Sequence, residues 1–298
     1  MMKMLERLIN YIKATKYNIG FIDGSLKSVI DGREVKVNWL KHSYKDRWFA
    51  DPFILDVTND EIILLVEEWY DKINRGRISK LTIDKKSCEL KALRVMIDEG
   101  FHMSFPAITR KVDGIYIQPE CGLTRGLMEY KYDEVTDSFL SGKIISELPL
   151  ADSVRNNLFG SDMMFSTKLP DANGKELGIY EWNKSTNRYD IKDYYHFDEN
   201  ISRMAGNFFT YNDNIYRPAQ VCIKSYGDAV SLQKVMHDDR GWYFEEIRRI
   251  YSPNPDYDLG FHTFNIYKNV IVVDALGYRK PKLTRMLRAI KNITNTKK

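Results

Sequence analysis

The chain has 298 residues, of which 43% are hydrophobic and 13% aromatic, and this composition is typical of a folded globular protein. Its apolar runs are shorter than the roughly 20 residues of a membrane-spanning helix. This length excludes the class of proteins that cross a membrane with such a helix. The three cysteines, Cys88, Cys121 and Cys222, lack the spacing of a metal-binding motif and are expected to be reduced.

The first predicted elements are a helix over residues 2–16 and a strand near residues 35–41. One face of the helix carries apolar side chains at helical spacing: Leu5, Leu8, Ile9 and Ile12. The segment contains Glu6 and lacks the apolar core and cleavage site of a signal peptide, which favours a cytoplasmic protein.

A hairpin unit then occurs five times, at residues 60–67, 113–120, 173–181, 213–220 and 267–274. Each copy has a polar turn and ends on a polar side chain: Glu67, Glu120, Glu181, Gln220 and Asp274. A short apolar segment precedes each hairpin and predicts first strands near residues 51–56, 104–109, 162–167, 205–210 and 262–267. The period of roughly fifty residues is that of a propeller blade. The sequence therefore predicts an all-β, five-bladed β-propeller.

The last predicted element is a basic amphipathic helix over residues 281–294. No acidic residue follows Asp274, whereas eight Lys or Arg residues do. We expect a single domain over residues 1–298, with the propeller at about 35–278 and the strand near 35–41 completing the fifth blade. The two terminal helices either pack on the propeller or bind an anionic membrane surface. The rest of the chain is mildly acidic, so nucleic acid is not an expected partner.

Antiparallel hairpins bring the start of each first strand and the end of each second strand to one rim. This rim is expected to be rich in carboxyl groups, and glycosyl transfer requires one protonated and one ionised carboxyl group. The candidate catalytic residues are Asp51 as base or nucleophile, Glu120 as acid, and Asp162. The candidate substrate-binding residues are Glu67, His102, Arg203, Arg217, Gln220, His262, Asn265 and Asp274.

Several of these side chains also have a structural interpretation. The acids could cap turns or pair with Arg203 and Arg217, and those arginines could instead bind a phosphate or a sugar acid. The two histidines could bind hydroxyls, act as acid-base groups or form a metal site with Asp51 and Asp162, although the spacing requires neither a metal nor a cofactor. Four aromatic side chains could stack on sugar rings or lie in the core: Trp69, Tyr116, Trp182 and Tyr216.

Seven short blocks carry a resemblance to a known family. They read RWFADPF at 47–53, HMSFP at 102–106, IQPE at 117–120, RMAG at 203–206, YRPAQ at 216–220, YG at 226–227 and HTFN at 262–265. In this order they resemble the N-terminal domain of plant glucosamine inositolphosphorylceramide transferase, and similar domains occur in bacterial polysaccharide-assembly proteins. The first block is also similar to the five-bladed glycosidases of the arabinanase/β-xylosidase and invertase/levansucrase groups. That resemblance implies that Asp51 is a base or nucleophile.

We therefore expect a carbohydrate-active protein of surface-polysaccharide or glycolipid assembly, with glycosyl transfer in a carboxylate-rich central pocket. An enzyme is favoured, with a sugar or sugar phosphate as substrate and no cofactor. One alternative is a non-catalytic glycan- or glycolipid-binding module that serves a partner transferase. A second alternative is an intracellular glycoside hydrolase. The expected location is the cytoplasm, peripheral to the inner membrane.

Overall fold

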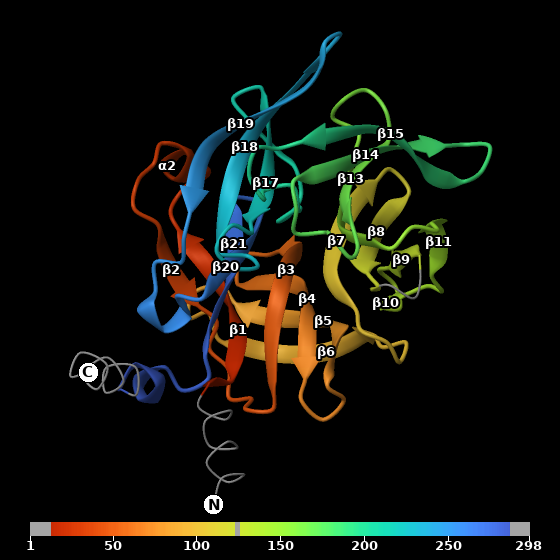
Figure 1. Cartoon of the computed structure of the whole chain (residues 1–298). Coiled ribbons are helices and arrows are strands. Elements are labelled where there is room, and N and C mark those ends of the chain that lie inside the picture. Colours follow the sequence, from red (N-terminus) through yellow and green to blue (C-terminus); the bar gives the residue numbers. More distant parts are fainter. Residues whose placement is uncertain (1–12, 123–125, 287–298) are drawn as a thin grey trace, which may run out of the picture.

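The computed structural model describes residues 13–122 and 126–286. These residues form five antiparallel sheets around a common centre, so the chain is a five-bladed β-propeller, as the repeats predict (Figure 1). Outside the sheets lie the short helices α2 (Leu26–Ile30) and η1 (Pro255–Tyr257). None of the helices in the described ranges has the length and apolarity needed to cross a bilayer.

The strands of blades 1 to 4 follow chain order from the centre of the ring outwards. Blade 1 comprises β3 (Arg47–Val57), β4 (Glu61–Tyr70), β5 (Arg75–Asp84) and β6 (Leu90–Ile97). Blade 2 comprises β7 (Ser104–Lys111), β8 (Gly114–Glu120), β9 (Leu127–Asp133), β10 (Ser138–Phe139) and β11 (Lys143–Ser146). Blade 3 comprises β12 (Leu150–Asn156), β13 (Met163–Lys168), β14 (Glu176–Asn183) and β15 (Arg188–His196). Blade 4 comprises β16 (Phe209–Tyr211), β17 (Asn214–Val221), β18 (Ala229–Asp238) and β19 (Gly241–Ile250).

Blade 5 combines strands from both ends of the chain. It comprises β20 (Gly260–Tyr267), β21 (Val270–Tyr278), β1 (Thr15–Asp23) and β2 (Lys36–Trp39). The strand expected near residues 35–41 is β2, but it is the outermost strand, and β1 lies between it and β21. The propeller therefore begins at Thr15 and not at about residue 35. The helix expected over residues 2–16 is wrong for Thr15 and Lys16, because strand pairing with Tyr278 and Gly277 of β21 holds these two residues extended.

The core lies between adjacent blades. Three consecutive residues of β4, Leu64, Leu65 and Val66, are all fully buried because neighbouring elements cover both faces of the strand. Leu64 belongs to a cluster shared with blade 5, and Leu65 belongs to a cluster shared with blade 2. The stacking of blades therefore explains why the inner strands are almost continuously apolar.

Blade 3 differs from the prediction in its innermost strand. The strand expected at residues 162–167 is β13, which is second in its sheet, and β12 occupies the innermost position. β12 was missed because most of its side chains are polar. Ser153 and Arg155 are nevertheless buried, with partners that other strands and loops supply. In blade 4, the strand expected at residues 205–210 is reduced to β16, and residues 201–208 follow an irregular path.

The two described ends of the chain leave the propeller side by side, next to β1 (Figure 1). The backbone N–H of Arg279 donates to the carbonyl of Ala14 at 2.8 Å. Both terminal nitrogens of Arg279 bind Asp71, which follows β4, at 2.7 Å. Residues 281–286 are helical. The remainder of the helix expected over 281–294, and residues 2–12 of the expected N-terminal helix, lie outside the described residues.

Candidate functional site

Seven charged or titratable side chains gather at the centre of the propeller, where the innermost strands begin. We call them the central acid cluster: Asp51, Glu67, Glu120, Asp152, Arg203, His262 and Asp274. Each is at least nine-tenths buried, from 0% exposure for Asp274 to 9% for Arg203. All five blades contribute: four through their first or second strand, and blade 4 through Arg203 in the irregular segment that precedes β16.

A repeated backbone irregularity aims three of the inner strands at this centre. Asp51, Phe105 and Asp152 have positive φ angles of 49°, 46° and 48°. The strand register shifts at the same three places, between Ala50 and Phe53 in blade 1 and at matching positions in blades 2 and 3. Such bulges bend a strand and re-aim a side chain. In blades 1 and 3 the re-aimed side chains are the carboxyl groups of Asp51 and Asp152.

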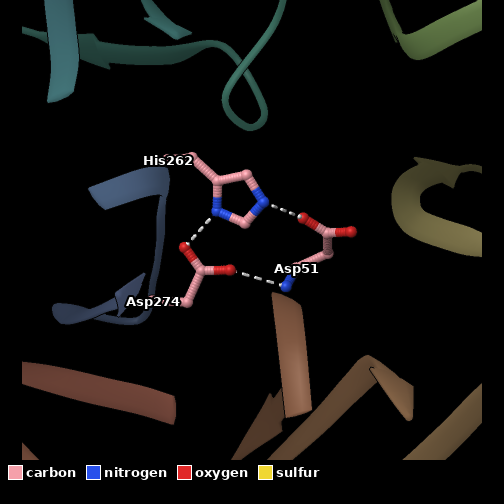
Figure 2. A group of neighbouring side chains, drawn as sticks. All are labelled: Asp51, His262 and Asp274. Carbon is pink, nitrogen blue, oxygen red and sulfur yellow. Dashed lines mark hydrogen bonds and ion pairs between the residues drawn. The ribbon is translucent and has the colours of Figure 1, made fainter. Parts of the chain in front are cut away.

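His262 joins two of the acids, as Figure 2 shows. Its Nδ1 lies 2.7 Å from Oδ1 of Asp274, and its Nε2 lies 3.3 Å from Oδ1 of Asp51. The other oxygen of Asp274 accepts the backbone N–H of Asp51 at 2.8 Å, and Oδ2 of Asp51 accepts the N–H of Phe105 at 3.1 Å. These contacts connect blade 5 to blades 1 and 2 through the centre.

The pKa values of Asp51 and His262 are both raised. Burial alone would lower the pKa of His262, but the charges of Asp274 and Asp51 outweigh burial and raise it to about 9. Burial raises the pKa of Asp51 to about 7, although the charge on His262 opposes this shift. At neutral pH, His262 is therefore positively charged, and Asp51 can both accept and release a proton.

The same three side chains offer the donor set for a metal ion. One donor atom each from Asp51, His262 and Asp274 lie within 4.8 Å of one another. Both ring nitrogens of His262 face carboxylate oxygens, and a metal ligand must present a free lone pair. A cation would therefore have to displace a proton from His262, whose pKa is raised. The donor atoms are close enough for a metal, but their hydrogen bonding fits a protonated histidine better.

The second half of the cluster is organised around Arg203. Its Nε binds Oδ2 of Asp152 at 2.6 Å, and its Nη2 binds Oε2 of Glu120 at 3.0 Å. Gln220 donates to the same oxygen of Asp152 at 2.6 Å. Burial raises the pKa of Glu120 to about 8 even though Arg203 opposes the shift, because Asp152 adds a second negative charge. Glu120 therefore holds a proton at neutral pH.

Glu67 and His102 lie nearer the outside of the channel. The side chain of Glu67 is 9% exposed and that of His102 is 43% exposed, and Nε2 of His102 lies 3.9 Å from Oε1 of Glu67. Burial, together with the charges of Asp51 and Glu120, raises the pKa of Glu67 well above its usual range. Burial lowers the pKa of His102, and Arg75 adds to this effect.

Aromatic side chains line the rim beside the cluster. Tyr17 stacks on His262 with the ring centres 4.6 Å apart, and Trp48 lies 5.4 Å from Tyr17. Trp69 is parallel to Trp48 at 5.4 Å, and Tyr226 meets the edge of His262 at 5.4 Å. A sugar ring presents apolar C–H faces that pack well on such surfaces. Of the four aromatic candidates from the sequence, only Trp69 lies here; the others pack within blades 2, 3 and 4: Tyr116, Trp182 and Tyr216.

Asp162 is not part of the central acid cluster. It precedes β13 at the opposite rim, where it binds Nη2 of Arg155 at 3.2 Å and accepts a hydrogen bond from Tyr189. It lines a cavity of about 530 Å³ together with Ile108 and Asn207. Asp162 is the only acid among the residues lining this cavity, which therefore lacks the pair of carboxyl groups that glycosyl transfer needs.

Two further predicted site residues, Arg217 and Asn265, have structural contacts instead. Arg217 is fully buried inside blade 4, donates to Gln233 at 2.7 Å and also binds the carbonyl of Ser202. Burial lowers the pKa of Arg217 to about 9. Asn265 donates to the carbonyl of Pro52 at 3.0 Å and thereby ties blade 5 to blade 1. The prediction that Arg217 reaches the central pocket is wrong, because three positions separate it from Gln220 and alternating side chains place the two on opposite faces of β17.

Sequence reasoning missed four residues of the site: the acid Asp152 and the rim aromatic residues Tyr17, Trp48 and Tyr226. Asp152 had a usable signal, because Ala151-Asp152 repeats the dipeptide Ala50-Asp51 that opens blade 1. Tyr17 had no such signal. It lies on the first strand of the chain and reaches His262 only because β1 pairs with β21.

Comparison with known proteins identifies the family. The family model described as glucosamine inositolphosphorylceramide transferase 1, N-terminal, matches residues 36–252. The chain belongs to this family. It is 25% identical over 199 residues to glucosamine inositolphosphorylceramide transferase 1 of Oryza sativa subsp. japonica, and the match covers 64% of the chain and 27% of that protein. The protein of the same name from Arabidopsis thaliana is 26% identical over 195 residues, and this match covers 63% of the chain and 25% of that protein. The chain thus spans about a quarter of the length of these relatives.

Two solved structures that share the fold are named as a galactanase and a xylosidase. The exo-β-1,3-galactanase of Phanerochaete chrysosporium superimposes with a TM-score of 0.55 at 7% identity, covering 75% of this chain and 55% of the other. The β-xylosidase RS223 superimposes with a TM-score of 0.53 at 9% identity, and the match covers 78% of this chain and 84% of the other. At these identities the comparison establishes the shared five-bladed fold.

Proposed function

We propose that this chain transfers a glycosyl group at the central acid cluster, during assembly of a glycolipid or a surface polysaccharide. The observation that carries the proposal is the imbalance of charge within the cluster. Five acids face only two cationic side chains, so carboxyl groups must hold protons at neutral pH. The raised pKa values of Asp51, Glu67 and Glu120 are consistent with this conclusion.

The cluster can supply both roles that glycosyl chemistry requires. A protonated carboxyl group assists departure of the leaving oxygen, and an ionised one activates the attacking group. Asp51, with a pKa of about 7, fits the ionised role, while Glu67 and Glu120 fit the protonated role. The aromatic rim of Tyr17 and Trp48 offers a stacking surface for the sugar.

The charge of the site narrows the class of donor. A phosphate-bearing donor needs cationic side chains that are not already neutralised. Arg217 lies elsewhere, and Arg203 binds both Asp152 and Glu120. We therefore propose a donor with a neutral leaving group, such as a glycoside, in place of a sugar phosphate. With water as the acceptor, the same chemistry gives the hydrolytic alternative.

A binding module is the second candidate function. The acids of the cluster are almost completely buried, which favours a site that encloses a small ligand group over one that holds a long chain. The relatives in rice and Arabidopsis are about four times longer than the matched segment, so a partner domain or protein that performs the transfer fits this alternative.

We further propose that the rim of the central acid cluster faces an anionic membrane on its cytoplasmic side. Asp71, which holds Arg279, follows β4 at the end that carries Glu67. The basic segment from residue 279 onwards therefore starts beside this rim. Leu283 and Met286 in its helical part are 37% and 54% exposed. Sedimentation with phosphatidylserine vesicles is expected to fall sharply when Lys280 and Lys282 are changed to Glu. Equal binding to neutral and anionic vesicles would contradict this location.

The test of function compares Asp51→Asn with Asp162→Asn. Both substitutions remove one carboxyl group, but only the first removes a group of the central acid cluster. The protein is incubated with panels of glycosides, lipid-linked sugars and nucleotide sugars, and products are measured by mass spectrometry with alcohol or water as acceptor. Asp51→Asn is expected to lower turnover at least about 100-fold, and Asp162→Asn less than about threefold. Ligand binding without turnover in any panel would identify a binding module.

A further inference from the structure

Glu67 differs from the other acids of the central acid cluster because the protein does not hold its carboxyl group. Hydrogen bonds or ion pairs of 3.3 Å or less engage the other acids: Asp51, Glu120, Asp152 and Asp274. Within the described residues, the carboxyl group of Glu67 makes no hydrogen bond, and the nearest basic side chain is His102, whose Nε2 lies 3.9 Å from Oε1. Its hydrogen-bonding capacity is therefore left for a ligand.

Gly76 on β5 provides the space that Glu67 occupies. A Cβ atom at this position would lie 2.3 Å from Oε1 of Glu67 and 2.7 Å from the carbonyl oxygen of Met103. Glu67 itself pairs with Ala50, the residue before Asp51, across β3 and β4. The fold thus places the carboxyl group of Glu67 next to that of Asp51, at the open side of the cluster.

The tautomer of His102 is fixed by the same glycine. The backbone N–H of Gly76 donates to Nδ1 of His102 at 2.9 Å, so the neutral ring carries its hydrogen on Nε2. Nε2 is the nitrogen that faces Glu67. Once Glu67 loses a proton, this N–H points at a carboxylate and stabilises it.

Glu67 also faces the acids of several other elements. These are Asp51 on β3, Glu120 on β8, Asp152 on β12 and Asp274 on β21, and each raises the pKa of Glu67 beyond the effect of burial. No Lys or Arg side chain lies within ion-pair distance of Glu67 among the described residues, and burial lowers the pKa of the neighbouring His102. Burial and these four acids therefore favour the protonated form of Glu67, and it is the most exposed carboxyl group of the cluster after Glu120.

We infer that Glu67 donates the proton to the leaving oxygen of the glycosyl donor, and that His102 is its positioning residue. This inference rests on the proposed function and replaces the expectation that Glu120 is the acid. Oε2 of Glu120 already accepts Nη2 of Arg203 and the backbone N–H of Asp152, whereas neither carboxyl oxygen of Glu67 accepts a hydrogen bond from the described residues.

The step is balanced as a single displacement. The bond between the sugar C1 and the leaving oxygen breaks, its electron pair stays on that oxygen, and the proton of Glu67 joins it. The oxygen of the acceptor hydroxyl forms the new bond to C1, and its proton passes to ionised Asp51. Proton exchange with solvent at the rim then returns Glu67 and Asp51 to their starting states.

Leaving-group dependence tests the proton donor. Dinitrophenolate leaves without protonation, whereas phenolate or an alkoxide needs a proton. Glu67→Gln is expected to lower turnover of phenyl glycosides at least about 100-fold and that of dinitrophenyl glycosides less than about tenfold. Glu67→Asp, which keeps the acid, should recover part of the loss. The inference is overturned if Glu120→Gln shows the selective loss, or if Glu67→Gln loses both substrates equally.

The pH profile tests His102. His102→Phe removes the N–H that stabilises ionised Glu67, so the alkaline limb of turnover should move to higher pH, while His102→Gln keeps an N–H donor and should move it less. If both variants lose turnover equally and the alkaline limb does not move, His102 has only a structural role.

Infrared spectroscopy separates this inference from the proposed function. The protein should show the carbonyl band of a protonated carboxyl group at neutral pH, and Glu67→Gln should remove part of that band. An unchanged band overturns the assignment of the proton to Glu67 even in an active enzyme. Absence of turnover on every glycoside, with the band still lost in Glu67→Gln, would overturn the proposed function.

Discussion

The side chains of the central acid cluster hold protons that an unfolded chain would release. Burial moves the pKa of Asp51 to about 7 and that of Glu120 to about 8, and the surrounding acids move the pKa of His262 to about 9. A group whose pKa is higher in the folded state stabilises the fold below its unfolded pKa, and that contribution is lost as the pH rises through the folded pKa. All three groups therefore make the folded state less stable as the pH rises.

The first prediction is that the melting temperature falls as the pH rises from about 5 to about 9. Asp51→Asn cannot ionise, so it should make this fall shallower between about pH 4 and about pH 7. Asp46→Asn is the control, because the pKa of Asp46 is lowered by Arg47 and its contribution disappears only at acid pH. Calorimetry measures the melting temperature across this pH range. A melting temperature that rises toward about pH 9 would contradict the raised pKa values of these groups.

At the scale of the element, the irregular inner segment of blade 4 explains how Arg203 reaches the centre. Residues 201–208 form only an isolated bridge, between Met204 and Ala219, before β16 begins. Arg217 binds the carbonyl of Ser202, and its Nε contacts the sulfur of Met204 at 3.0 Å. The buried Arg217 thus satisfies the carbonyl group before Arg203, while the carbonyl of Arg203 itself accepts the backbone N–H of Gln220 on β17 at 2.8 Å.

We predict that Arg217→Ala destabilises the protein by at least about 2 kcal/mol, because it leaves a cavity and unpaired carbonyl groups in a fully buried region. Arg240→Ala, whose side chain is 81% exposed, should change stability by less than about 0.5 kcal/mol. Denaturant unfolding measures both. A loss of ligand affinity in Arg217→Ala without any loss of stability would restore the direct binding role that the sequence suggested.

At the scale of the whole molecule, the ring is closed by strands from the two ends of the chain. β1 and β2 complete the sheet begun by β20 and β21, and β2 is the outer edge strand of blade 5. Ile19 on β1 is fully buried in a cluster that also contains Phe49, Leu64 and Val272. The N-terminal strand therefore joins blade 5 to blade 1.

Removing this closure should cost much of the stability of the fold. Ile19→Ala is expected to lower the free energy of unfolding by about 2–5 kcal/mol, whereas Ile191→Ala, at a position that is 42% exposed on β15, should lower it by less than about 0.5 kcal/mol. Guanidinium unfolding compares the two variants. Similar losses in both would mean that β1 is not required for closure.

The sequence by itself determined the number of blades and most of the acids at the centre. Repeated hairpins of similar length ending on Glu67, Glu120, Gln220 and Asp274 could be recognised because hydrophobic alternation and turn residues are local signals. The pairing of antiparallel strands then placed these four ends at one rim, whereas the same prediction is wrong for the fifth end, Glu181, which lies beside Asp162 at the opposite rim.

Only the tertiary structure decided which polar side chains could be buried. β12 lacks an apolar pattern, and it becomes an inner strand because Arg203, Glu129 and Ser166 from other elements satisfy its polar groups. The inner position of β12 brings Asp152 to the centre and leaves Asp162 at the opposite rim. β1 likewise becomes a strand, and carries Tyr17 to His262, because strands distant in sequence hydrogen-bond to it. Partners that are distant in sequence leave no local pattern. These parts of the site could therefore be found only in the tertiary structure.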